Sequence, residues 1–202
     1  VDFPMNGVIG ATGGLIGNSV IICGGWDDDD SSIYEGFNLN SEKATLVTHM
    51  SVERDAAASI VINDNILWVT GGFAQNLGYL ATTEYVTVTG TMLGPDLPMT
   101  LVYHAMVAIN STCSMVIGGC NDMNQFSYYA STHYYHHNEG KWITGPSLMQ
   151  ARSKMASGII TDEVSDEPFI VVTGGYYYAH LDSTEIFQDG EWVQGKEIIP
   201  RT

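Results

Sequence analysis

A double-glycine motif recurs four times along this chain, each time directly after a run of apolar residues. The pairs begin at Gly24, Gly71, Gly118 and Gly174, so successive pairs are 47, 47 and 56 residues apart. The longer last interval contains an additional acidic segment, TDEVSDEP, just before the last apolar run. The regular spacing predicts a chain of four similar repeats rather than four unrelated turns.

Each repeat contains four short segments of strand character. In the second repeat they are 56–63, 66–71, 82–89 and 91–97, and turn residues separate them. The second segment of every repeat is nearly continuously apolar, as expected for a strand that is buried on both faces. No segment has a convincing 3.6-residue apolar period. The chain is therefore predicted to be all-β, with four antiparallel strands per repeat, and a period near 47 is typical of a propeller blade.

The glycine pair, followed by a Tyr and by a Trp about seven residues further on, resembles the kelch repeat of β-propellers. The third repeat matches best, with Gly118-Gly119, Tyr135 and Trp142. The other repeats match in part, through Trp192 in the fourth and Tyr34 and Tyr85 in the first two. The resemblance extends over essentially the whole chain. The sequence also looks similar to those of secreted kelch-type proteins of invertebrates.

This resemblance implies one β-propeller domain with blades at about 6–50, 51–98, 99–148 and 149–200. Kelch propellers usually close with six or seven blades, so we expect these four to belong to a larger ring that is truncated at both ends. The last residues, KEIIPRT, correspond to the linkers between repeats, which predicts a fifth blade beyond them. The alternative is a closed four-bladed ring.

The glycines themselves have a structural explanation. Where the second strand ends, the backbone must turn with a positive φ or lie against another chain segment, and only glycine does this without steric cost. We therefore interpret the four pairs as part of the fold and not as a phosphate-binding loop.

The charge of the chain limits its partners. Seven Lys and Arg residues stand against 23 Asp and Glu residues, which gives a formal net charge of −16. Such a chain is not expected to follow a nucleic-acid backbone or to bind an anionic membrane. The sequence contains no stretch of about 18 apolar residues, which a membrane-spanning helix would need.

The loops between the second and third strands of the repeats, here called the b–c loops, are expected to lie on one face together with the linkers between repeats. They combine acidic and aromatic side chains, which suit a protein partner that carries Lys and Arg residues. The sequence therefore predicts a non-catalytic interaction module with a basic partner. The candidate binding residues are Trp26, Asp27, Asp28, Asp29, Asp30, Phe73, Tyr79, Asp122, Phe126, Tyr129 and Tyr177.

Other interpretations of this face stay open. The rings could pack inward while the aspartates only favour solubility, and the module could be a structural subunit of an extracellular or cytoskeletal assembly. A third alternative, from the family resemblance, is a fragment of a copper radical oxidase. We expect no enzyme activity and no cofactor, because no motif for a nucleophile, a metalloprotease or a phosphate loop is present.

Two groups of residues resemble metal sites, but we expect neither to bind a metal ion. The run Asp27–Asp30 lacks the ligand spacing of a calcium loop and is interpreted as a solvated acidic segment. His133 and His137 would share one face of a strand and His136 the other, so the three are predicted to be surface histidines of an outer strand.

The cysteines and one sequon bear on the location of the protein. Cys113 and Cys120 flank one strand and should lie about 23 Å apart, so no disulfide between them is expected. Cys23 belongs to a different repeat, so no disulfide within this stretch is expected, which favours a reduced compartment or partners in missing blades. Asn110 begins a glycosylation sequon in a predicted hairpin. We expect an extracellular protein, with the cytoplasm as the alternative.

Overall fold

The computed structural model describes residues 9–26, 35–38, 45–122, 127–161 and 168–195. The chain forms two compact halves, Val1–Val102 and Tyr103–Thr202. All regular secondary-structure elements in the described ranges are β-strands, so the all-β prediction is confirmed.

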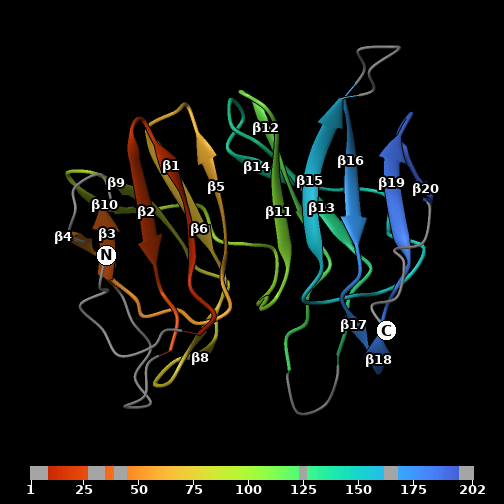
Figure 1. Ribbon diagram of the computed structural model, residues 1–202, viewed down its shortest axis with the longest axis horizontal. Coiled ribbons are helices and arrows are strands. Elements are labelled where there is room, and N and C mark those ends of the chain that lie inside the picture. The colour runs from red at the N-terminus through yellow and green to blue at the C-terminus, as the bar shows by residue number, and fades with distance from the viewer. Residues whose placement is uncertain (1–8, 27–34, 39–44, 123–126, 162–167, 196–202) are drawn as a thin grey trace. The chain divides into compact units, whose positions relative to one another are not determined.

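Each half contains two antiparallel four-stranded sheets, in which the chain passes up and down through neighbouring strands (Figure 1). In the N-terminal half, the first sheet consists of β1 (Thr12–Ile16), β2 (Ser19–Cys23), β3 (Glu35–Asn38) and β4 (Thr45–His49). The second sheet consists of β5 (Ala58–Ile62), β6 (Ile66–Thr70), β9 (Thr83–Thr87) and β10 (Gly90–Leu93).

In the C-terminal half, the third sheet consists of β11 (Ala105–Asn110), β12 (Cys113–Ile117), β13 (Thr132–His136) and β14 (Lys141–Thr144). The fourth sheet consists of β15 (Ala156–Thr161), β16 (Pro168–Thr173), β19 (Thr184–Gln188) and β20 (Glu191–Gln194). Short hairpins follow the second strands of the second and fourth sheets: β7 (Phe73–Ala74) with β8 (Gly78–Tyr79), and β17 (Tyr176–Tyr177) with β18 (Ala179–His180).

The burial of the second strands agrees only in part with the sequence. β6 and β12 are buried along four of five residues, as predicted for strands covered on both faces. β2 and β16 instead alternate between buried and more exposed residues. The prediction was wrong for these two, because each places only one face in an apolar core, through Ile21 and Cys23 in β2 and Ile170 and Val172 in β16.

The fourth strand of the second sheet is shorter than the predicted segment 91–97. β10 ends at Leu93, just before Pro95, which has no N–H to continue the ladder. The next backbone amides still bond to the third strand and the loop before it. Gly94 N–H donates to the Thr83 carbonyl at 2.9 Å, and Leu97 N–H donates to the Ala81 carbonyl at 2.8 Å.

The four glycine pairs have the positive φ angles that the sequence predicts. Gly24 and Gly25 have φ of 70° and 100°, and the later pairs repeat these values closely. Space is also limiting, since a Cβ on Gly24 would lie 2.5 Å from the Arg54 carbonyl oxygen. The second glycine of a pair donates its N–H to a carbonyl of the following linker, as in Gly25 to Arg54 at 2.7 Å, Gly72 to Leu101 at 2.8 Å and Gly119 to Arg152 at 2.8 Å.

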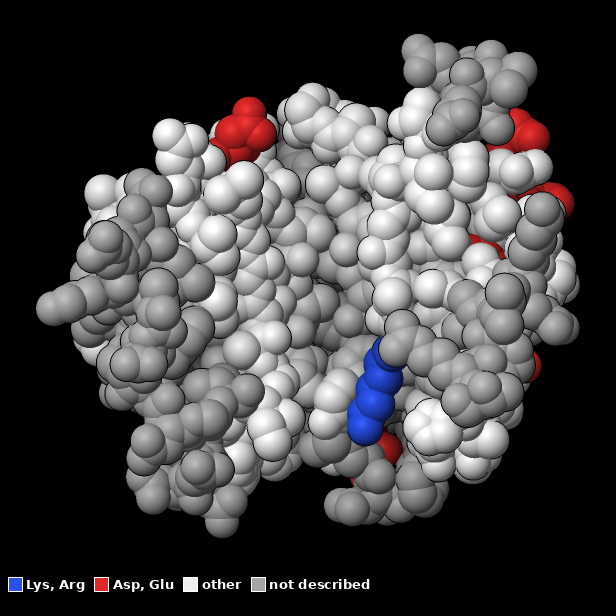
Figure 2. All heavy atoms as spheres, viewed as in Figure 1, with Lys and Arg blue, Asp and Glu red and all other residues white. Residues whose placement is uncertain are grey.

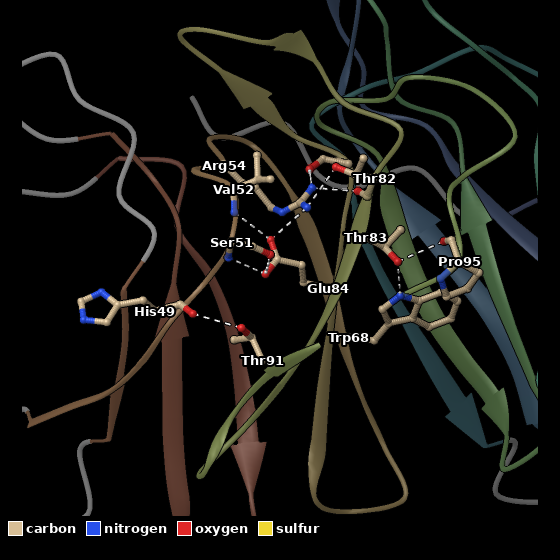
Figure 3. A network of polar contacts seen from close by, with 11 residues as sticks. His49, Ser51, Val52, Arg54, Trp68, Thr82, Thr83, Glu84, Thr91 and Pro95 are labelled. Carbon is tan, nitrogen blue, oxygen red and sulfur yellow. Dashed lines mark hydrogen bonds and ion pairs between the residues drawn. The ribbon is translucent and has the colours of Figure 1, made fainter. Parts of the chain in front are cut away.

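Two of these linkers carry a buried arginine that the sequence analysis did not identify. In the N-terminal half, Arg54 Nη1 donates to the carbonyls of Gly71 and Thr82, and its Nη2 lies 3.1 Å from Oε1 of Glu84 (Figure 3). Glu84 in turn accepts the backbone N–H groups of Ser51 and Val52 at 2.7 and 3.1 Å. The pair therefore fastens the linker to both the glycine turn and the third strand.

The C-terminal half repeats this arrangement. Arg152 Nη1 donates to the carbonyls of Gly174 and Ser183, and its Nη2 lies 2.7 Å from Oε1 of Glu185. Glu185 accepts the N–H groups of Met149 and Gln150. Both ion pairs are almost completely buried, with side-chain exposure of 1% or less. A buried charge is tolerated only when it is paired and hydrogen-bonded, as all four of these are.

Candidate interaction surface

The b–c loops lie beside the linkers between sheets, as the sequence predicts. Phe73 pairs with Asp55 in an isolated β-bridge of the N-terminal half, and Tyr176 pairs with Ser153 in the same way in the C-terminal half. Each bridge joins the residue that follows a glycine pair to the linker just before a sheet. The loops and linkers of each half therefore form a common surface.

In the N-terminal half, the predicted aromatic residues are half-buried and engaged within the loops. Trp26 forms a bridge with Ile9, and the Phe73 and Tyr79 rings contact each other edge to face with centroids 5.3 Å apart. The two contacting rings, Phe73 and Tyr79, fit the alternative in which aromatic side chains pack inward. The acidic run Asp27–Asp30 lies outside the described residues.

In the C-terminal half, four tyrosines form one partly exposed cluster, here called the tyrosine cluster. The ring of Tyr128 lies 5.8, 5.6 and 5.4 Å from the rings of Tyr176, Tyr177 and Tyr178. Tyr177 and Tyr178, which adjoin the turn of the β17–β18 hairpin, are 37% and 62% exposed. Of the predicted binding residues, Tyr177 thus has the exposure that a contact surface needs.

The other predicted residues of this half have different surroundings. Tyr129 is half-buried, and its backbone N–H donates to the Gly119 carbonyl at 2.9 Å. Burial raises the pKa of the Tyr129 hydroxyl, and a side-chain hydrogen bond with Asn121 lowers it by less. Phe126 lies outside the described residues, and Asp122 lines the pocket described next.

A pocket of about 240 Å³ lies beside the tyrosine cluster, here called the tyrosine pocket. Its lining combines three aromatic rings with one cation, one carboxylate, a hydroxyl and a thiol. The lining residues are Tyr103, Cys120, Asp122, Tyr128, Ser153, Lys154 and Tyr176. All of them belong to the C-terminal half.

Two residues of the pocket occupy an unusual backbone position. Tyr103 and Lys154 each precede the first strand of a sheet by two residues, and their φ angles are 52° and 55°. The Lys154 N–H donates to the Tyr103 carbonyl at 2.9 Å, and the Lys154 Nζ lies 4.4 Å from the centre of the Tyr103 ring. The two side chains are thus placed together by the linkers.

The surroundings of Cys120 have opposing effects on the pKa of its thiol. Burial raises the pKa of the thiol most, and the charge of Asp122 adds to this, whereas Lys154 and a hydrogen bond with Ser153 lower it. Cys120 also forms an isolated β-bridge with Tyr128, a proximity that the sequence did not predict. Partial desolvation raises the pKa of Tyr128 as well.

The three clustered histidines are half-buried and only partly at the surface, and the prediction of an outer strand was wrong. His133 and His136 lie in β13, the third of four strands, and both are half-buried. His137 follows the strand, and its Nε2 lies 2.8 Å from the Ser114 hydroxyl. Burial lowers the pKa of His133 and of His137. Within the described ranges, no three His, Cys, Asp or Glu side chains form a group that could hold a metal ion.

All three cysteines are free thiols, which confirms that Cys113 and Cys120 are not linked. Asn110 is exposed in the β11–β12 hairpin, where its Oδ1 accepts the N–H and the hydroxyl of Thr112 at 2.9 Å each. This exposure agrees with the sequence analysis, and glycosylation of Asn110 stays a prediction.

Tyr103 and Lys154 were not predicted from the sequence to contribute to this surface. A usable signal was present, because the positions two residues before the first strands align as Gly10, Ala56, Tyr103 and Lys154. The large side chains at the last two depart from the small residues at the first two. Charge also singles out Lys154, since the chain contains only seven Lys and Arg residues. Figure 2 likewise shows few basic side chains on the face in view.

The chain matches no protein-family model and no curated protein. Among solved structures, it is similar to one described as "Structure of YjhT", with a TM-score of 0.81 and 13% sequence identity. The similarity covers 98% of this chain and 73% of that chain. At this identity the comparison supports the β-sheet fold alone. None of the described residues forms a helix long and apolar enough to cross a membrane.

Proposed function

We propose that this protein is a non-catalytic interaction module that binds a protein partner through the tyrosine cluster. The exposure of Tyr177 and Tyr178 beside the ring of Tyr128 carries this proposal. Tyrosine supplies a large contact area with few rotatable bonds, and it is enriched among the residues that dominate binding energy. Tyr178 also has a φ of 56°, a strained conformation of the kind that concentrates at functional positions.

We further propose that the four sheets are blades of a kelch-type β-propeller, part of a ring of six or seven blades. The regular glycine pairs, the four-stranded antiparallel sheets and the hydrogen bonds from glycine pairs to linkers support this assignment. An experimental structure of the full-length protein tests it. Sheets arranged without a common axis would contradict it.

The partner is proposed to be a basic protein in an extracellular setting. The charge of −16 and the run Asp27–Asp30 support a basic partner, since acidic residues accelerate encounter with positively charged surfaces. Changing the four aspartates to Asn should slow association and weaken its salt dependence. Unchanged association kinetics would contradict a role for this run.

Photo-crosslinking tests the tyrosine cluster directly. A benzophenone amino acid at position 178 should capture the partner from the native source, whereas the same group at Val193, a 37%-exposed residue of β20, should not. Affinity for the captured protein is then measured with the double variant Tyr177→Ser/Tyr178→Asn, because Asn tolerates a positive φ. We expect a loss of at least about tenfold, typical of truncating a central aromatic contact.

A matched double variant controls for lost apolar surface. Ile143→Ser/Val193→Ser removes exposed side chains of β14 and β20, which are 42% and 37% exposed. It should leave affinity unchanged. Equal losses in both double variants would contradict a specific role of the tyrosine cluster.

A further inference from the structure

In each four-stranded sheet, the residue two positions before the first strand has a left-handed backbone conformation. Its φ is 76° at Gly10, 54° at Ala56, 52° at Tyr103 and 55° at Lys154. This conformation is a property of the linker, and glycine adopts it without steric cost. The C-terminal half nevertheless has a tyrosine and a lysine there. Strained large residues of this kind point to a role for their side chains.

Both side chains line the tyrosine pocket. Lys154 is exposed and its ammonium lies over the Tyr103 ring, so the cation is held at a defined place in the lining. Contact with an aromatic face stabilises a cation without neutralising its charge. The ammonium therefore keeps hydrogen-bond donors for a further partner.

Lys154 also differs from the other basic residues that the structure describes. Arg54 and Arg152 are buried in ion pairs, and Lys141 pairs with Glu139 at the surface. Lys154 has no ion pair within the described ranges. An unpaired exposed cation in an aromatic pocket is notable in a chain of net charge −16.

We propose that the tyrosine pocket binds a single carboxylate group, which pairs with Lys154 while the apolar body of the ligand contacts Tyr128 and Tyr176. Asp122 also lines the pocket, so the two formal charges of the lining cancel. Asp122 repels any anion, and it repels doubly charged phosphate more strongly than a monoanion, so a single carboxylate is preferred over phosphate. The volume of about 240 Å³ suits a small acid or one terminal residue of a peptide.

This inference rests on the proposed function where the carboxylate belongs to the protein partner. A free small acid offers the same chemistry to Lys154. The two sources share one recognition mechanism, so the experiment first tests the carboxylate and then separates its sources.

Benzoate is the probe for the carboxylate, with benzamide and benzamidinium as neutral and cationic controls of nearly the same shape. Binding is followed by amide and side-chain NMR signals of Tyr103, Lys154 and Tyr176. We expect saturable shifts with benzoate and a Kd on the order of 10 mM, the weak affinity of a small fragment. The two controls and inorganic phosphate should bind at least several-fold more weakly. Equal or stronger binding of benzamidinium or phosphate would overturn the inference.

Three lysine variants separate recognition from stability. Lys154→Met should abolish saturable benzoate binding, while Lys141→Met, at a surface lysine outside the pocket, should leave it unchanged. Lys154→Gly should also lose binding but keep or raise the melting temperature, because glycine relieves the left-handed strain. Retained benzoate binding in Lys154→Met or Lys154→Gly would overturn the assignment of Lys154.

The source is tested with acetyl-Ala-Phe and its C-terminal amide. Binding of the acid but not of the amide supports a peptide carboxylate, and binding of benzoate alone supports a free small acid. Failure of all carboxylates overturns this inference only. The crosslinking experiment and the Tyr177→Ser/Tyr178→Asn variant test the proposed function independently, because they use the partner itself.

Discussion

The Arg54 guanidinium lies 3.1 Å from a carboxylate oxygen of Glu84, and neither side chain is exposed to solvent. The Arg54 side chain also reaches two backbone carbonyls, and Glu84 accepts two backbone N–H groups. Burial lowers the pKa of Arg54, whereas the charge of Glu84 raises it. The pair joins three chain segments of the N-terminal half.

Removal of one member of this pair should destabilise the protein strongly. Arg54→Met leaves the Glu84 carboxylate buried without its cation, which should lower the free energy of unfolding by about 3–5 kcal/mol. Adding Glu84→Gln should cost less than the sum of the two single changes, since the uncompensated charge disappears. Urea denaturation measures all three variants.

A surface ion pair provides the control. Lys141→Met breaks the exposed contact with Glu139 and should not shift the urea midpoint measurably. Additive effects of Arg54→Met and Glu84→Gln would show that the buried pair is not energetically coupled.

Two glycine substitutions separate backbone strain from steric exclusion. Gly17 has a φ of 55° and nothing within 4 Å of an added Cβ, so Gly17→Ala should cost only about 1–2 kcal/mol of left-handed strain. Gly24→Ala should cost clearly more, because its Cβ would also lie 2.5 Å from the Arg54 carbonyl oxygen. Thermal and urea unfolding of the two variants provides the comparison, and equal losses would argue against close packing at the glycine pair.

Stability should fall as the pH drops below about 6.5. His104 is 7% exposed, and burial lowers its pKa to about 3. Between these values the unfolded chain binds a proton that the folded chain excludes. The contribution is therefore fully present above the unfolded pKa and is lost on acidification, by up to about 1.4 kcal/mol per pH unit.

The variant His104→Leu tests this assignment. Its free energy of unfolding, measured from pH 7.5 to pH 5, should depend less steeply on pH than that of the parent protein. Some slope should remain, because burial lowers the pKa of His133 and His137 in the same direction. An unchanged slope would exclude His104 as a source.

The thiols should differ in reactivity. Cys23 is 1% exposed, and burial raises its pKa to about 12, so it should react with iodoacetamide only when the chain unfolds. Cys113 is half-buried and should react first in the folded protein. Mass spectrometry of a timed digest orders the three sites. Early labelling of Cys23 would contradict its place in the core.

The sequence predicts the elements better than it predicts the site. The glycine pairs mark the strand ends because a positive φ excludes most other residues, and this local requirement is visible in the chain itself. The arginine–glutamate pairs were missed because their partners lie about 30 residues apart, at 54 and 84 and at 152 and 185. Their signal was the recurrence of Thr-Glu at the start of two third strands.

The candidate surface was predicted only in part, because exposure depends on how each loop folds. Phe73 and Tyr79 pack against each other across a small hairpin, whereas Tyr177 and Tyr178 at the turn of a similar hairpin remain accessible. Composition alone does not distinguish these outcomes. Lys154 was missed for a related reason, since only the backbone geometry of the linker brings it to the tyrosines.

The hydrogen bonds from glycine pairs to linkers have an evolutionary consequence. Gly25, Gly72 and Gly119 each use an acceptor that lies beyond the end of their own sheet, in the chain that leads to the next. Each sheet therefore supplies the donor glycine, and the linker that follows the sheet supplies the acceptor. Duplication or deletion of one whole period preserves every such bond, whereas a change by a fraction of a period breaks one. Lineages of such chains should vary in length by complete periods.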